Sequence, residues 1–379
     1  MSAKLKHKLS SYWREALIIS MFVIAIVTVV HSYQNKYRMT KIYSLYNTLN
    51  DYGFSTKEQK AILENLMQQA SILAPGESIQ AKFPNKYNYD DLVVDILEFV
   101  KLTQKYFTIR SGNQERWEIK PHEWMMKNKA ENFKLLKILG MTLSVGPKFQ
   151  NVDALCILGG KMSNMQGRID YVALLLEKGL KANNLILLSG ERYVTVKIDG
   201  TQEELNKIAA SYQLADSSKL TETHLIQKAY EESTLHNKIP TYVIDTPARD
   251  LPRPTTQTTI LELIEWLKRH EEIKTITFVS NQPYVKYQEA VIKEAMRNFD
   301  TPINIEVVGA AYNNDNVQPI IEALGSFIFA VTPDVLIKSG EKIKDPELIN
   351  SFRELYAKQP LIYKNLEHNL FNKNDDKNL

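Results

Sequence analysis

The chain has 379 residues, of which 44% are apolar and 24% are charged. This composition excludes a disordered or fibrous protein, and the length allows a substantial core and two modest domains. Because 47 lysines and arginines nearly balance 44 aspartates and glutamates, the chain lacks the broad basic field typical of nucleic-acid binding, and we expect no nucleic-acid partner.

An apolar segment near the N-terminus predicts a membrane anchor. Residues 16–30 carry no charge, and Trp13 and Tyr33 flank them like aromatic residues at a membrane interface. The span is just long enough to cross a bilayer of about 30 Å. A cleaved signal peptide and a buried helix are alternatives, although Val30-His31-Ser32 is a poor cleavage site. We therefore expect residues 1–35 to form a tail and a transmembrane helix, with the lipid bilayer as a partner.

Basic residues on the two sides of this segment indicate its orientation. Lys4, Lys6, Lys8 and Arg14 precede it, whereas Lys36, Arg38 and Lys41 follow it. The slight excess before the segment favours a cytoplasmic N-terminus. For a bacterium, this predicts a single-pass protein of the inner (cytoplasmic) membrane, with the bulk of the chain periplasmic or otherwise extracytoplasmic.

Residues 36–148 predict a mainly helical accessory domain. Ser55 followed by Glu58 is a capping-box pattern that opens a helix, which Pro75-Gly76 ends. Residues 90–100 predict another helix. Residues 106–109 and 116–119, on either side of Ser111-Gly112, predict a hairpin.

Residues 149–335 alternate between strand-like and helical patterns. The apolar strand-like runs are 154–158, 185–188, 241–244, 275–279 and 305–308, and the main helical patterns between them are 167–178, 221–233, 259–270 and 284–298. Continuous apolar strands separated by amphipathic helices are typical of a parallel sheet covered on both faces. We therefore predict an α/β fold with a Rossmann-like, doubly wound parallel sheet, followed by a C-terminal helix and a charged tail over residues 336–379.

The side chains needed for two common kinds of site are missing. The single cysteine, Cys156, lies in the first apolar run and is expected in the core, and the seven histidines show no metal-ligand spacing. No Gly-X-Ser-X-Gly elbow occurs. The sequence therefore predicts neither a metal site nor a hydrolase triad.

Ligands of such sheets bind beyond the carboxyl ends of the strands. After the first strand, Gly159 and Gly160 would let a ligand approach the backbone, and the helix that follows would offer free N–H groups to a phosphate or carboxylate. This loop is neither a dinucleotide fingerprint nor a P-loop, and a plain tight turn is an equal interpretation. Ser189-Gly190-Glu191 follows the second strand and Ser280-Asn281 follows the fourth, so we expect a polar pocket floor, with helix capping as the alternative.

Three segments of this core resemble the SanA/ElyC/YdcF-like family, a mostly bacterial group of Rossmann-like domains of unknown function. They are Leu158-Gly159-Gly160, Gly167-Arg168-Ile169-Asp170 and Leu187-Leu188-Ser189-Gly190. Glu222 looks like the family's glutamate that opens a later helix, and residues 253–259 are similar to its threonine-rich segment. The resemblance covers roughly residues 153–309, with an insertion over residues 191–219 that either covers the pocket as a lid or extends the surface.

The resemblance implies a role in cell-envelope biogenesis and a small anionic ligand. A nucleotide, an S-adenosylmethionine-like compound and a lipid-linked phosphate are the ligands it suggests. The residues alone identify no cofactor, and the resemblance suggests S-adenosylmethionine or a nucleotide. The ligand-binding residues that we infer are Gly159, Gly160, Arg168, Asp170, Ser189, Gly190, Thr255 and Asn281. Glu191 and Glu222 are the candidates for proton transfer.

Two alternatives stay open. Arg168 either pairs with the anion or lies on the helix surface beside Asp170 or Glu191. The whole protein is either a ligand-binding protein or enzyme, or a non-catalytic envelope scaffold that binds partner proteins.

Overall fold

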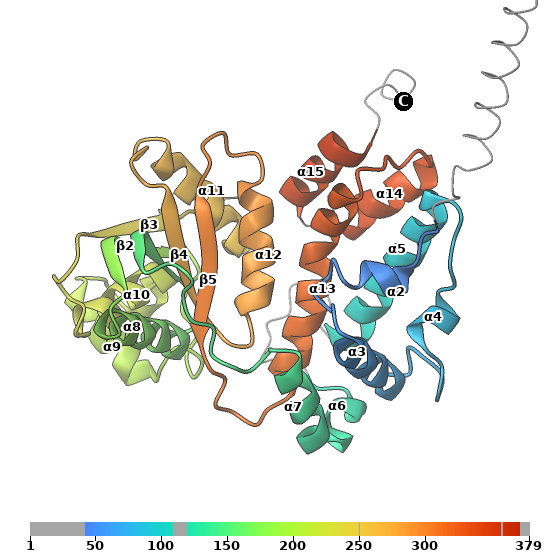
Figure 1. Cartoon of the computed structure of the whole chain (residues 1–379). Coiled ribbons are helices and arrows are strands. Elements are labelled where there is room, and N and C mark those ends of the chain that lie inside the picture. Colours follow the sequence, from blue (N-terminus) through green and yellow to red (C-terminus); the bar gives the residue numbers. More distant parts are fainter. Residues whose placement is uncertain (1–41, 109–119, 250, 358, 372–379) are drawn as a thin grey trace, which may run out of the picture.

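The computed structural model describes residues 42–108, 120–249, 251–357 and 359–371. The expected anchor, the charged end of the chain and most of the expected hairpin lie outside these ranges. Figure 1 shows an α/β lobe beside a helical lobe, with α12 and α13 lying side by side where the lobes meet.

The α/β lobe contains a five-stranded sheet with the order β3-β2-β1-β4-β5. The strands are β1 (Asn151–Leu158), β2 (Lys181–Gly190), β3 (Thr241–Thr246), β4 (Thr275–Asn281) and β5 (Asn304–Ala310), and all of their pairings are parallel. The expected strands and the α/β class are therefore confirmed. The chain reverses its direction of winding when it passes from β3 to β4, so a crevice opens between the carboxyl ends of β1 and β4.

Helices cover both faces of this sheet, as the continuous apolar strands predict. On one face lie α8 (Met162–Glu177) and α10 (Glu222–Glu231), and on the other α11 (Thr256–Leu267) and α12 (Val285–Met296). Alternate residues of β1 divide between the two cores: Leu155 and Ile157 pack towards α8, whereas Cys156 packs towards α11 and α12. Cys156 is fully buried.

The helix after β1 begins earlier than expected. The sequence pattern predicts its start at Gly167, but α8 begins at Met162, after Lys161 in extended conformation. The amides of Asn164 and Met165 both donate to the Lys161 carbonyl, which closes the first turn. The run from Ser163 to Gly167 has low helix propensity, but burial of Met165 holds it in the helix. Arg168 consequently lies in the second turn rather than at the helix start.

The expected insertion after β2 is folded. It contains α9 (Gln202–Ser211) and the short helix η2 (Ser217–Lys219), and Leu205 joins the core on the α8 side of the sheet. Its first part, residues 191–200, runs back beside the start of α10 through a bridge between Tyr193 and Thr221. We call residues 191–200 the Arg192 loop.

The helical lobe is made from two distant parts of the chain. Its helices are α2 (Leu45–Thr48), α3 (Lys57–Gln69), α4 (Ile79–Lys82), α5 (Tyr89–Phe107), α6 (Glu123–Lys127), α7 (Lys129–Ile138), α13 (Gln318–Lys338), α14 (Pro346–Leu355) and α15 (Pro360–Leu370). One continuous core includes Leu63 and Phe99 from the first part and Leu324 and Phe352 from the second. The region before the sheet therefore shares its core with the C-terminal helices.

Two local expectations in this lobe were wrong. Thr56 and Gln59, rather than Ser55 and Glu58, form the capping box of α3. Tyr106 and Phe107 end α5 instead of starting a strand, because Phe107 continues the buried face of that helix.

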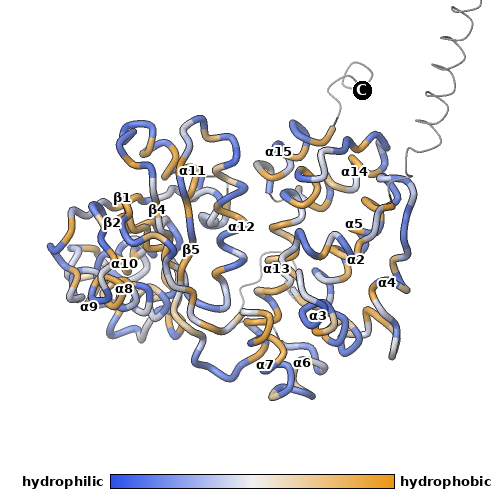
Figure 2. The backbone as a smooth tube through the Cα atoms, in the orientation of Figure 1, coloured by the Kyte–Doolittle hydropathy of each residue, from blue (hydrophilic) through white to orange (hydrophobic). Residues whose placement is uncertain are grey.

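Among the residues that the structure describes, α13 is the one helix long and apolar enough to cross a membrane, and most of it is buried inside the protein. Figure 2 shows hydrophobic residues gathered on the sheet and along α13. Burial of this kind is typical of a core helix, and α13 packs against both α5 and α12.

The segment between the lobes is fixed to the carboxyl ends of β4 and β5. Val145 and Gly309 exchange backbone hydrogen bonds. Gln282, just after β4, donates through Nε2 to the carbonyls of Gly140 and Leu143 at 3.2 and 2.7 Å. These contacts join the ends of β4 and β5 to the segment between the lobes.

Candidate functional site

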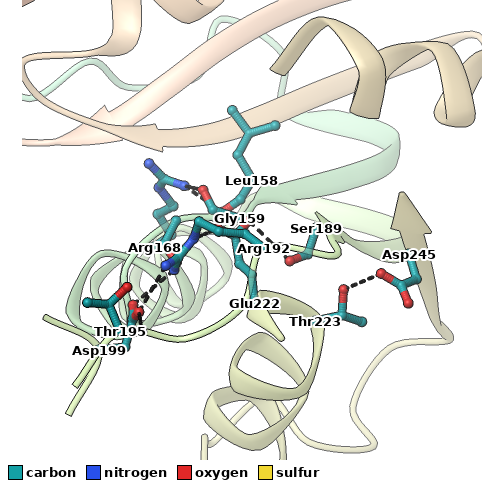
Figure 3. Close-up of polar contacts among 11 residues, drawn as sticks. Leu158, Gly159, Arg168, Ser189, Arg192, Thr195, Asp199, Glu222, Thr223 and Asp245 are labelled. Atoms are coloured by element: carbon teal, nitrogen blue, oxygen red, sulfur yellow. Dashed lines mark hydrogen bonds and ion pairs between the residues drawn. The ribbon is translucent and has the colours of Figure 1, made fainter. Parts of the chain in front are cut away.

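Arg168 joins the ends of β1 and β4 across the crevice. Its side chain is buried, with 3% of the residue exposed. Nη1 donates to the carbonyls of Leu158, at 2.6 Å, and Gly159, and Nε and Nη2 donate to Oδ1 of Asn281 at 3.0 and 2.8 Å. Figure 3 shows the guanidinium beside the Leu158 and Gly159 backbone. In this arrangement Arg168 holds the protein's own backbone and Asn281, and it lies on neither the helix surface nor an open ligand site.

Glu222, the first residue of α10, lies under the loop that follows β1. Its Oε2 accepts a hydrogen bond from Nε of Arg192 at 2.7 Å, and its Oε1 accepts one from Oγ of Ser189 at 3.2 Å. Burial raises the pKa of the Glu222 carboxyl above its usual range, although the nearby guanidinium groups of Arg192 and Arg168 offset part of the shift. A buried carboxyl with a raised pKa binds its proton more tightly than an exposed one, which makes Glu222 a candidate for proton transfer.

Only glycine fits at position 159, because the Glu222 and Ser189 side chains lie against its backbone. A Cβ on this residue would lie 2.0 Å from Oε1 of Glu222 and 3.0 Å from Oγ of Ser189. The Glu222 carboxylate therefore lies directly against the backbone at the end of β1, in the space that any other side chain would fill.

Arg192 and Asp199 complete the network, and neither was predicted from the sequence. Nη1 and Nη2 of Arg192 each donate to one Asp199 oxygen at 2.9 Å, and Nη2 also donates to the Gly160 carbonyl at 3.0 Å. Asp199 accepts a further hydrogen bond from the Thr195 amide at 2.9 Å. One sequence feature could have indicated Arg192, because it lies two residues after the end of β2, where ligand-binding residues are expected. It was passed over because it lies in the segment interpreted as an insertion. Figure 3 shows Arg192 lying between Asp199 and Glu222.

The loop from β1 to α8 turns its carbonyl groups towards these arginines. The carbonyls of Gly159 and Gly160 accept hydrogen bonds from Arg168 and Arg192, respectively. In a trans peptide the C=O and the following N–H point in opposite directions, so the amide of Gly160 points away from Arg168. Within the described part of the chain, the amides of Gly160, Met162 and Ser163 have no acceptor, and no side chain caps α8. Such a helix start attracts an anion.

Gly190 and Asn281 lie close to this network, in keeping with their expected places at strand ends. A Cβ on Gly190 would lie 2.6 Å from the Thr246 carbonyl, so this glycine lets β2 and β3 end close together. On the far side of Ser189, Oγ1 of Thr223 donates to Oδ1 of Asp245 at 2.6 Å.

Three of the residues that we expected in the site lie away from it. Asp170 is exposed on α8. Thr255 is exposed and caps α11, where its Oγ1 accepts from the Thr258 amide at 3.3 Å. Glu191 is exposed and accepts a hydrogen bond from the Ala248 amide at 3.0 Å. Capping and loop closure explain Thr255 and Glu191, as in the alternative interpretation.

A surface cavity of about 530 Å³ lies elsewhere, beside Tyr230, His236, Lys238 and Thr241. Thr241 is the first residue of β3, so this cavity is at the amino end of that strand. Parallel α/β sheets bind their ligands at the opposite edge, where Glu222 lies. In the described residues no group of three histidine, cysteine or acidic side chains is placed to hold a metal ion.

Comparisons of the chain with known protein families, with curated proteins and with solved structures gave no match.

Proposed function

We propose that this chain is a membrane-anchored protein of the cell envelope that binds a small anionic ligand at the start of α8. The observation that carries the proposal is the group of amides at Gly160, Met162 and Ser163, which follow Gly159, the residue against which the buried Glu222 lies. An anionic group would accept hydrogen bonds from the amides and would gain from the helix dipole. The resemblance to the SanA/ElyC/YdcF-like family supports the envelope role, through Leu158-Gly159-Gly160 and Glu222.

Arg168 has an indirect part in this proposal. Because its guanidinium binds the Leu158 and Gly159 carbonyls, it fixes the loop so that the Gly160 amide points away from Arg168. The anion is then bound by backbone N–H groups, and Arg168 keeps the loop in shape.

Glu222 is the acid–base candidate of the site. It can exchange a proton with Ser189, the hydroxyl that donates to it at 3.2 Å. A nucleotide, an S-adenosylmethionine-like compound and a lipid-linked phosphate remain the ligand classes of the proposal, since each carries a phosphate or a carboxylate.

A thermal-shift screen tests the proposed ligand. The full chain in detergent is melted with inorganic phosphate, adenosine monophosphate or S-adenosylmethionine, and we expect at least one of them to raise the melting temperature by mass action. If none does at millimolar concentration, ligand binding at this site is contradicted. The expected topology is tested separately: a C-terminal alkaline phosphatase fusion in a bacterial host should be active, and an inactive fusion would contradict it.

The second candidate is a non-catalytic envelope scaffold. It is favoured by the fact that Arg168, Arg192 and Glu222 are all paired with groups of the protein itself. Deleting residues 42–141 would be a poor test, because that segment shares a core with α13. A better test is a proline substitution that removes one of the amides at the start of α8. If that variant keeps the cellular phenotype, the scaffold hypothesis is preferred to the ligand-binding hypothesis.

A further inference from the structure

The insertion over residues 191–219, which begins with the Arg192 loop, was expected either to cover the pocket as a lid or to extend the surface. We propose instead that Arg192 is a positioning residue, which holds the Glu222 carboxylate against Gly159 at the carboxyl edge of the sheet. This proposal rests on the proposed function, in which Glu222 is the acid–base group of the site.

The guanidinium of Arg192 contacts two carboxylates and one backbone carbonyl of the site. Nε holds Glu222, Nη1 and Nη2 hold Asp199, and Nη2 also reaches the Gly160 carbonyl. A planar fork with donors in three directions can make these contacts together, whereas the single ammonium of a lysine cannot. One side chain therefore links the carboxylate to the loop whose amides face the proposed anion.

The backbone of the Arg192 loop is registered against the start of α10. The Glu222 amide donates to the Arg192 carbonyl at 2.8 Å, and the Val194 amide donates to the Leu220 carbonyl at 3.2 Å. Lys197 and Gly200 close the loop with a further hydrogen bond at 2.8 Å. Arg192 and Glu222 thus sit at fixed neighbouring positions, and 8% of Arg192 is exposed.

Asp199 holds the other end of the guanidinium. It is 4% exposed, and its two oxygens both accept from Arg192 at 2.9 Å. A buried charge without its counter-charge is strongly destabilising. If the Arg192 guanidinium moved away from Asp199, both groups would be left in that state, so the ion pair keeps Arg192 in its observed position. The charged groups close to Glu222 are Arg192 and Arg168, with Asp199 beyond Arg192.

Arg192 should therefore control when Glu222 releases its proton. Burial raises the pKa of Glu222 and the contact with Arg192 lowers it. Loss of the guanidinium should move the titration of Glu222 to still higher pH, by about one pH unit or more for an opposite charge at this distance.

The titration is followed by ¹³C NMR of the full chain in detergent, labelled at the glutamate carboxyl carbons and without ligand. Glu222→Gln identifies the Glu222 signal. Arg192→Met removes the guanidinium, and Arg192→Lys keeps a charge without the fork. Lys207→Met, which removes an exposed charge from α9, is the matched control and should leave the titration unchanged.

We expect the midpoint of Glu222 to rise in Arg192→Met and to rise less in Arg192→Lys. If Arg192→Met does not fold, as judged by circular dichroism, the smaller rise in Arg192→Lys is the deciding result. An unchanged midpoint in a folded Arg192 variant overturns the proposal. Because no ligand is present, that failure concerns Arg192 alone, whereas a failure to bind any anion would concern the proposed function.

Discussion

The Glu222 carboxylate fills the space at the end of β1 where a side chain of residue 159 would lie: a Cβ on Gly159 would be 2.0 Å from Oε1 of Glu222. The carboxylate can lie against the strand only because residue 159 has no side chain. The contact joins Gly159, which the sequence pattern predicts in the ligand-binding loop, to Glu222, which the family resemblance suggests as a site residue.

Gly159→Ala should destabilise the protein, since the new methyl group must displace the Glu222 carboxylate. We expect a loss of about 1–3 kcal/mol, which is typical of overpacking, in urea unfolding followed by circular dichroism. Gly167→Ala is the matched control, because a Cβ on Gly167 would meet no atom within 4 Å. That helical substitution should raise stability by about 0.5–1 kcal/mol. Equal stability of the two variants would contradict the close packing at Gly159.

Asn281→Ala should loosen the crevice between β1 and β4. It removes the acceptor of both Nε and Nη2 of Arg168, which is 3% exposed. A buried charged donor that loses its acceptor costs about 1–3 kcal/mol or more. Asn281→Asp keeps an acceptor for Arg168 but loses the hydrogen bond that Nδ2 donates to the Gln282 carbonyl, so it should be destabilised less than Asn281→Ala. Urea unfolding measures both variants, and a fully stable Asn281→Ala would show that Arg168 does not need this contact.

The stability of the protein should depend on pH through Glu222. The pKa of this carboxyl is raised in the folded state, above the value of about 4.3 expected for an unfolded chain. The folded state therefore binds the proton more tightly, and the resulting stabilisation is complete below the unfolded pKa and is lost as pH rises through the folded pKa.

Glu222→Gln removes this titration. The free energy of unfolding of the variant, relative to that of the native protein, should therefore become larger as pH rises across that window, because only the native protein loses stability there. Denaturant unfolding at a series of pH values measures the difference. A difference that stays constant with pH would mean that the pKa of Glu222 is not raised.

Thr255 and Asp170 should be dispensable for ligand binding, in contrast to the sequence expectation. Thr255→Ala should cost about 1 kcal/mol through the lost helix cap. Asp170→Asn, at an exposed position, should change stability by less than about 0.5 kcal/mol. Neither should alter the affinity for an anion at α8. A tenfold loss in either variant would extend the site to these residues.

The fold could be predicted much further than the site. Runs such as 154–158 are apolar at every position, because helices cover both faces of the sheet, and this pattern is visible without any partner. The role of Arg168 could not be predicted, because most of its acceptors are backbone carbonyls, which have no sequence signature. Arg192 was missed because its partner Glu222 is distant in sequence, and the bridge between Tyr193 and Thr221 that brings them together forms only in the folded chain.

Phosphate binding by Met162→Pro is the most direct test of the anion site. Met162 is the first residue of α8, and Lys161 before it has φ −65° and ψ 152°, which suits a following proline. The substitution removes one of the amides proposed to bind the anion and leaves the helix intact. Met162→Ala removes the same side chain and keeps the amide.

Isothermal titration of the full chain in detergent with inorganic phosphate compares the two variants. We expect Met162→Ala to bind like the native protein and Met162→Pro to bind about tenfold more weakly or worse, since a hydrogen bond to a charged group contributes about 1.5–3 kcal/mol. Equal phosphate affinities in the two folded variants would contradict binding at the start of α8.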